Sequence, residues 1–134
     1  MNTLGLITAL STFLGIWLGH VSVRAIERRT VHLWQPILAA LTLGLALEVV
    51  SLSTANRHLS AAAGILGVTV LWDALEFVRQ EKRVKKGHAP ANPANPRHAR
   101  ILAEYPSATT LDLLARDPIG RPVSPEEAEA LVRR

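Results

Sequence analysis

Residues 4–23 read LGLITALSTFLGIWLGHVSV, and this stretch carries no formal charge. About twenty such residues form a helix of roughly 30 Å, which matches the hydrocarbon core of a bilayer. A secretory signal is the rival interpretation, but it needs positive charge before the apolar run and a small-residue cleavage site after it. Here the three preceding side chains are uncharged, and Arg24, Arg28 and Arg29 follow the run instead. The stretch therefore predicts a membrane-spanning helix.

Two further apolar blocks occupy residues 33–53 and 59–78. A buried helix of a soluble domain and a helix lying on the membrane surface are alternatives for the last block. Its central part is apolar on every face, unlike a surface helix, and the first two blocks lack the polar outer faces of soluble packing. The sequence therefore predicts an all-α fold. Residues 1–80 form a three-helix transmembrane bundle with spans at about 4–23, 33–53 and 59–78, followed by an extended cytoplasmic C-terminal tail that contains short helices.

Lys and Arg are unevenly distributed, since eleven of the fifteen lie from Arg79 onward and the second loop has only Arg57. The positive-inside rule then places the first loop and the tail in the cytoplasm and the N-terminus outside, in the inner membrane of a cell. Three tryptophans would then lie towards the cytoplasmic boundary, where aromatic residues anchor helices. The residues expected at the basic membrane surface are Arg24, Arg28, Arg29, Arg79, Lys82, Arg83, Lys85 and Lys86.

The composition excludes several kinds of chemistry. The chain contains no cysteine, so disulfides, thiolate metal sites and cysteine nucleophiles are excluded. No aromatic residue interleaves with the basic residues at 79–100, so the segment favours a membrane surface over nucleic acid. There is no nucleophile with an adjacent base, no glycine-rich phosphate loop and no paired-histidine metal motif. The sequence thus predicts a protein that is not an enzyme, and it identifies no cofactor.

Small residues recur at spacings of three or four in each predicted span. Lipid tails are as apolar as leucine, so helices in a membrane associate through close approach of such residues. These faces hold the three helices to one another, or at least one of them meets another subunit, and both uses are compatible with so thin a bundle. The helix-packing candidates are Ser11, Gly15, Gly19, Ala40, Gly44, Ser60, Gly64 and Gly67.

Four ionisable residues lie within the spans, and such residues are functional candidates by default. They are His20, Glu48, Asp73 and Glu76. Asp73 and Glu76 lie three apart near the inner boundary, where pairing with nearby basic residues is the main interpretation and a proton or ion relay is the alternative. Glu48 lies about one and a half turns inside the outer boundary. It pairs with Arg57, stays protonated or meets a partner subunit.

His20 lies near the inner end of the first span. Interhelical hydrogen bonding, metal or pigment ligation and proton transfer all stay open for it. A single histidine without companions at ligand spacing is weak evidence for a cofactor, so a structural role is the main interpretation.

Residues 81–97 read EKRVKKGHAPANPANPR, a basic start followed by prolines three apart. Proline removes a hydrogen-bond donor and favours extended backbone, so this segment predicts a basic, semi-rigid juxtamembrane linker.

Residues 98–134 contain two short helix signals, at about 109–116 and 125–133. The second is the clearer, because Ser124 is a suitable cap and Pro125 suits the first helical position. Helices of this length are marginal alone in water. The tail is therefore expected to be disordered or to fold on the cytoplasmic surface of a partner.

Several features between the first span and about Arg97 occur together in a known family. His20 closes the first span, Glu27 lies in the basic loop and Trp34 opens the second span. Leu66-Gly67, Leu71-Trp72 and Glu76 come next, and then EKRVKKG at 81–87 and PANP at 90–93. In these features the chain resembles a family of small bacterial membrane proteins catalogued as domain of unknown function 4491. The resemblance implies three spans and a short inner tail, and it implies no activity, substrate or site residue.

The chain departs from that family in two ways, because it continues to Arg134 and carries Glu48 in the second span. Both departures point to a specialised role. The leading hypothesis is a non-catalytic accessory or scaffold subunit of a larger membrane complex, with an energy-transducing assembly, respiratory or photosynthetic, as the first place to look. The bilayer and the other subunits are then its partners, and nucleic acid is not.

Two alternatives belong to other functional classes. The first is a small proton- or ion-conducting or transporter oligomer that uses Glu48, His20 and Asp73. The second is a membrane-anchored docking protein whose tail recruits a cytoplasmic partner.

Overall fold

The structure is a computed structural model that describes residues 2–112 and 124–132, and the regular elements of these residues are all α-helices. The expected all-α class is thus confirmed. The chain divides into two compact units, Met1–Glu81 and Lys82–Arg134.

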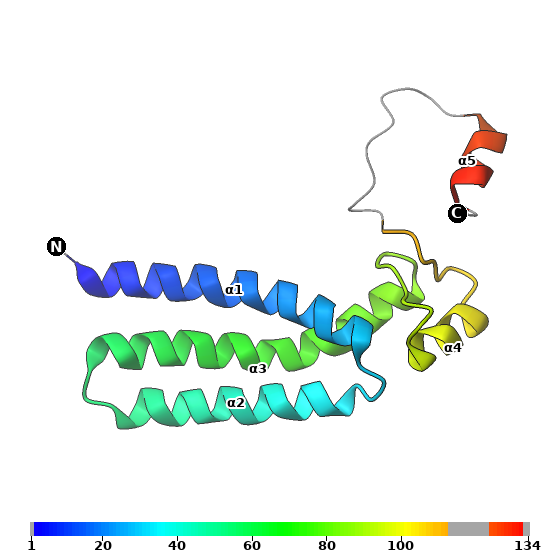
Figure 1. Ribbon diagram of the computed structural model, residues 1–134. Helices are drawn as coiled ribbons and strands as arrows, with labels where there is room; N and C mark the ends of the chain where they lie inside the picture. Colours follow the sequence, from blue (N-terminus) through cyan, green and yellow to red (C-terminus); the bar gives the residue numbers. More distant parts are fainter. Residues whose placement is uncertain (1, 113–123, 133–134) are drawn as a thin grey trace. The chain divides into compact units, whose positions relative to one another are not determined.

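Three long helices make up the first unit, namely α1 (Thr3–Arg29), α2 (Trp34–Ser53) and most of α3 (Arg57–Lys85). Each is long and apolar enough to cross a membrane, as expected of a multi-pass membrane protein. The helices run side by side with α3 between α1 and α2 (Figure 1). Both α1 and α3 continue past the predicted apolar blocks into the basic segments beyond them.

Local side chains fix where these helices begin. Asn2 Oδ1 accepts a hydrogen bond from the Gly5 amide at 3.0 Å, and Asn56 Oδ1 accepts one from the His58 amide at 3.0 Å. Both bonds satisfy amides that have no partner within the helix. Thr3 Oγ1 lies 3.0 Å from His58 Nε2, so the first turns of α1 and α3 are neighbours and these two helices run in the same direction.

Val23, Ala40, Ala74 and Phe77 form a cluster of buried apolar side chains in the first unit. Many of the other large apolar side chains are exposed, and Phe13 is 65% exposed. The helices instead meet through small residues, as helices do when lipid rather than water surrounds them.

The end of α3 begins the second unit with a glycine turn. Gly87 has φ +72°, its amide donates to Val84 O at 3.0 Å, and the His88 amide donates to Arg83 O at 2.8 Å. This pair of bonds is the Schellman motif that ends helices. A Cβ at Gly87 would strike the Ser107 carbonyl oxygen, so the turn requires glycine twice over.

Residues 88–97 do not form the extended spacer that the prolines predicted. Ala89 and Ala91 are buried with Val84 and Ile101 in a small core, and the Ala91 amide donates to Thr109 O at 2.8 Å. The glycine turn folds the segment back, and backbone hydrogen bonds hold it there. The supposed linker is therefore part of a folded unit.

A helix that the sequence reasoning missed comes after this segment, α4 (Pro96–Glu104). Asn95 caps it by accepting from the Arg97 amide at 3.0 Å, with Pro96 in the first turn. Its His98 is fully buried, and Nδ1 of that ring accepts from the Asn92 amide at 2.9 Å. The repeat of Pro-Ala-Asn-Pro at 93–96 thus supplies the cap and the first residue of this helix.

The last helix is α5 (Pro125–Val132), close to the predicted bounds. The Glu127 amide donates to Ser124 Oγ at 3.2 Å, as the capping signal predicted. The helix expected over about 109–116 does not begin where predicted, because residues 109–112 are not helical. Residues 113–116 lie outside the described part of the chain.

Candidate functional site: an apolar groove and two carboxylates between the helices

Helices α2 and α3 approach until their backbones touch. A Cβ at Gly44 would lie 2.6 Å from Leu71 Cγ and 3.0 Å from Gly67 O, and a Cβ at Gly67 would lie 3.1 Å from Gly44 O. Only glycine at both positions allows this separation. Ala40, on the same side of α2, is also buried.

Glu48 lies in this closed interface. Its carboxylate rests against Gly67, where a Cβ would overlap Oε1 and lie 3.1 Å from Cδ. Glu48 Oε1 is buried and has no hydrogen-bond partner among the described residues, and no ion pair with Arg57 forms there. A buried polar atom without a partner is uncommon in folded proteins and calls for an explanation.

Two serines close the same interface at its other end. Ser51 Oγ donates to Ser60 O at 2.9 Å, and Ser60 Oγ donates to Ser51 O at 2.8 Å. A Cβ at Gly64 would lie 2.9 Å from Ser51 Oγ, so this glycine makes room for the hydroxyl. The predicted small residues of α2 and α3 therefore face each other within one chain.

Helix α1 meets α3 in a different way. Ser11, Gly15 and Gly19 are buried on α1 at spacings of four. A Cβ at Gly15 would lie 3.2 Å from Thr69 Oγ1, and a Cβ at Gly19 would lie 2.7 Å from Asp73 Oδ1. The glycines of α1 therefore face only side chains of α3, whereas Gly44 and Gly67 face both a side chain and the backbone of the partner helix.

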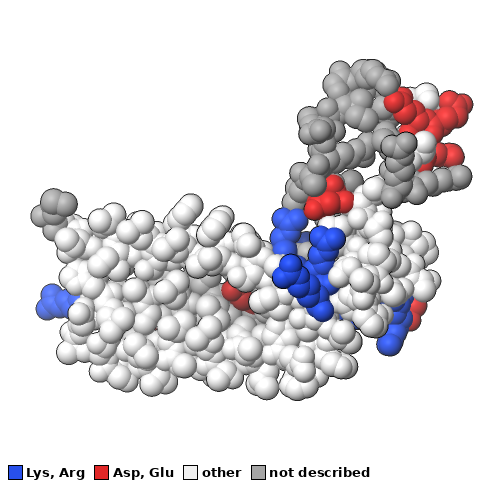
Figure 2. Space-filling model, in the orientation of Figure 1, with Lys and Arg blue, Asp and Glu red and all other residues white. Residues whose placement is uncertain are grey.

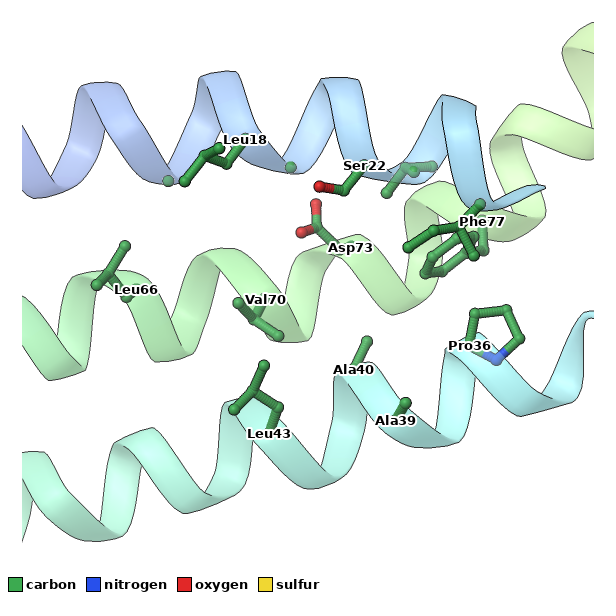
Figure 3. Close-up of a pocket in the computed structure, with 14 residues that line it drawn as sticks. Leu18, Ser22, Pro36, Ala39, Ala40, Leu43, Leu66, Val70, Asp73 and Phe77 are labelled. Atoms are coloured by element: carbon green, nitrogen blue, oxygen red, sulfur yellow. The ribbon is translucent and has the colours of Figure 1, made fainter. Parts of the chain in front are cut away.

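A groove of about 340 Å³ remains between α1 and α2, with α3 along it. Figure 3 shows that Asp73 points from α3 towards α1, beside Ser22. The rest of the lining is mostly apolar. The residues of the groove that matter most for its shape and charge are Gly19, Ser22, Ala39, Ala40, Val70 and Asp73.

Asp73 has no hydrogen bond or ion pair with any described residue. His20 is exposed on α1 and forms no ion pair with Asp73. No group of three or more His, Asp or Glu side chains in the described residues could hold a metal ion. The groove thus presents a single unpaired carboxylate within apolar walls.

Glu76, in contrast, has a partner. Its Oε1 accepts from Arg79 at 2.9 Å, and the Arg79 guanidinium lies 4.6 Å from the centre of the Trp72 ring. The salt bridge and the cation–π contact together hold Arg79 near the end of the predicted span. Of the two acids near this boundary, the structure pairs Glu76 and leaves Asp73 open to the groove.

Three basic residues of the first unit lie together near the end of α1. Arg24, Arg28 and Arg29 are exposed there, whereas Arg57 begins α3 beside the first turn of α1. Basic side chains accordingly appear at both ends of the three-helix unit in Figure 2. In the second unit Lys82, Arg83 and Lys86 are exposed, and Lys85 Nζ lies 5.2 Å from the centre of the Tyr105 ring. Between its ends, the visible face of the three-helix unit is uncharged apart from a small acidic patch.

A family model described as "Domain of unknown function (DUF4491)" matches residues 2–95. The chain belongs to this family. The comparisons with curated proteins and with solved structures found no match. The DUF4491 region contains α1, α2 and α3 with both carboxylates, and it ends at Asn95, the cap of α4. The groove is therefore built entirely from residues of the DUF4491 region.

Sequence reasoning identified Asp73 and Glu48 but missed what each one faces. It also missed Ser22 in the groove and the reciprocal bonds of Ser51 and Ser60. Spacing along one helix shows which residues share a face, but the pairing of faces depends on the register between helices. The DUF4491 sequence offers no local signal for that register.

Proposed function

We propose that this DUF4491 protein is a non-catalytic accessory or scaffold subunit of a larger membrane protein complex. The observation that carries the proposal is the unpaired Asp73 carboxylate in the groove between α1 and α2. A charged group among apolar surroundings is costly unless it is paired, and ionisable residues in membrane helices pair with one another. A neighbouring subunit can supply the group that Asp73 lacks.

The packing of the small residues limits which surfaces of the bundle a partner can bind. The small-residue faces of all three helices are used within the chain, since Gly15 and Gly19 face α3 and Gly44 faces Gly67. A partner subunit therefore meets either the bulky outer faces or the groove. The groove combines two small exposed residues, Ser22 and Ala39, with the carboxylate of Asp73, so it favours a specific partner over lipid.

The proposal includes an orientation. The end of the first unit that carries Arg24, Arg28 and Arg29 lies in the cytoplasm, and the start of α1 lies outside, as the positive-inside rule requires. The second unit, with its exposed lysines and its own small core, then lies on the cytoplasmic side of an inner cell membrane.

Affinity purification tests the accessory role. The tagged chain is extracted from native membranes in a mild detergent, and the proteins that remain bound are identified and quantified by mass spectrometry. We expect a fixed set of membrane proteins at constant ratio to this chain. Recovery of the chain alone, in a detergent that preserves known complexes of the same membrane, would contradict the proposal.

A second candidate rests on Glu48, whose buried Oε1 has no hydrogen-bond partner among the described residues. Carboxylates held in this way occur in proton and ion pathways of membrane proteins. On this hypothesis several copies assemble into a small conducting oligomer, with Glu48 as the group that carries the proton or ion.

Flux measurements separate the two candidates. The purified chain is reconstituted in vesicles, and proton or sodium flux is compared with that of Glu48→Gln, which keeps the volume of the side chain. A conducting role predicts flux that the substitution abolishes. Flux at the level of empty vesicles, or equal flux in both proteins, leaves the accessory role as the proposal.

A further inference from the structure

We propose that the groove between α1 and α2 receives one transmembrane helix of a partner protein, and that this helix carries a lysine or arginine that pairs with Asp73. The inference rests on the proposed accessory function and names the chemistry of the partner. Two properties of the groove support it, namely its shape and its charge.

The shape suits a segment that runs along the helices. On α3 the groove extends from Leu66 to Phe77, which is roughly 16 Å or three helical turns. Its walls contain two small exposed residues, Ser22 from α1 and Ala39 from α2, which lie between the larger side chains of Leu18, Ile26 and Leu43. Small residues of this kind allow close packing between helices in a membrane.

The charge of Asp73 indicates which kind of side chain the partner helix carries. Asp73 is the only charged residue of the groove, and its polar neighbour Ser22 has no charge to offer. A lipid chain could fill the volume but would leave the carboxylate without a partner. A lysine or arginine at the same depth would pair with it, as ionisable residues in transmembrane helices do.

The sequence argues against a second copy of this chain as the occupant. Residues 4–23, 33–53 and 59–78, the three apolar blocks, contain no lysine or arginine. His20 is the only histidine of these blocks, and it does not line the groove. A different protein is therefore the better source of the basic side chain.

The first experiment measures binding of a synthetic helix to the full chain in phosphatidylcholine vesicles. The probe is an apolar Leu/Ala peptide of about 20 residues with one lysine roughly five residues from one end, close to the depth of Asp73. The matched peptide has leucine in place of that lysine. Energy transfer between a donor on the chain and an acceptor on the peptide reports association.

We expect the lysine peptide to bind roughly three- to fifteenfold more tightly than the leucine peptide, the range that polar contacts between membrane helices span. Asp73→Asn should remove this difference and leave binding of the leucine peptide unchanged. Equal binding of the two peptides to the unaltered chain would overturn the proposal, and this comparison does not depend on how the variant folds.

The second experiment locates the peptide. The chain has no cysteine, so Ser22→Cys in the groove and Val21→Cys beside it give a matched pair on one helix. Both residues are exposed, and only Ser22 lines the groove. A lysine peptide that also carries a cysteine should form a disulfide with Ser22→Cys at least severalfold faster than with Val21→Cys.

Other outcomes decide against the inference. Equal cross-linking at both positions would show that the peptide does not enter the groove. Disulfide-linked dimers of Ser22→Cys alone, formed in preference to those of Val21→Cys, would assign the groove to a second copy.

Failure here is distinguishable from failure of the accessory role. If the same proteins co-purify with Asp73→Asn at constant ratio, the complex exists but the groove is not its contact. If the lysine peptide binds but no protein co-purifies with the chain, the groove binds a helix but the chain is not part of a stable complex.

Discussion

The two interfaces of α3 use glycine in different ways. Towards α2, Gly44 and Gly67 bring the two backbones into contact, and the Oε1 atom of Glu48 is buried beside them. Towards α1, Gly15 and Gly19 make room for the side chains of Thr69 and Asp73.

This difference separates a structural contact from an open site. The α2–α3 contact includes reciprocal serine hydrogen bonds and leaves Glu48 Oε1 buried, so it behaves as a closed hairpin. The α1–α3 contact places Asp73 at the margin of a groove, where a further molecule can reach it. A glycine at a helix contact therefore does not by itself show whether the contact serves packing or binding. The atoms of the neighbouring helix that face the glycine show which of the two applies.

The largest expected effect is that of Gly67→Ala, which adds one methyl group to the α2–α3 interface. Its counterpart in the α1–α3 interface is Gly15→Ala. Gly67→Ala would place its Cβ against Glu48 and 3.1 Å from Gly44 O, where the backbone cannot give way. We expect it to lower the free energy of unfolding by about 1–3 kcal/mol. Gly15→Ala meets only side-chain atoms at 3.2–3.3 Å and should cost less than about 1 kcal/mol. Unfolding of the purified chain in mixed micelles measures both.

A control for alanine itself is Gly5→Ala, because a Cβ there has only ordinary contacts, the nearest at 3.5 Å to Asn2. If Gly15→Ala were as damaging as Gly67→Ala, the α1–α3 interface would be as closed as the α2–α3 interface.

A second prediction concerns the two carboxylates. Glu48→Gln keeps the side-chain volume and removes a charge whose Oε1 is buried without a partner, so it should raise the free energy of unfolding by about 1 kcal/mol. Asp73→Asn should change it by less than about 0.5 kcal/mol, since the groove leaves that carboxylate accessible. The same unfolding assay measures both variants. A loss of stability in Glu48→Gln would mean that the charge has a favourable role in the closed interface.

The sequence predicted the helices well because each span is a long uninterrupted apolar run. It also identified the residues that could matter, including Gly19, Gly67 and both carboxylates. It did not predict that Gly19 faces Asp73 or that Gly67 faces Glu48, because register between helices is a property of the packed bundle.

The error over residues 88–97 has a different cause. Prolines three apart favour a spacer, but Asn95 before Pro96 is also a helix-start signal, of the same kind as Ser124 before Pro125. The core around Ile101 also determines where the tail can be shortened. A deletion that begins after Asp112 would keep Ile101 and this core and would test the remaining tail alone.

The smallest expected effect concerns the serine pair that closes the α2–α3 interface. Ser51→Ala and Ser60→Ala each remove one interhelical hydrogen bond, which is worth about 0.6 kcal/mol on average in membrane proteins. Both bonds need the same helix separation, so losing one should weaken the other, and the double variant should cost less than the sum of the single variants. Ser53→Ala is the control, because Ser53 Oγ donates only to Val49 O of its own helix, and its cost should be near zero. Strict additivity in the unfolding assay would contradict this coupling and would mean that the glycines alone set the distance between α2 and α3.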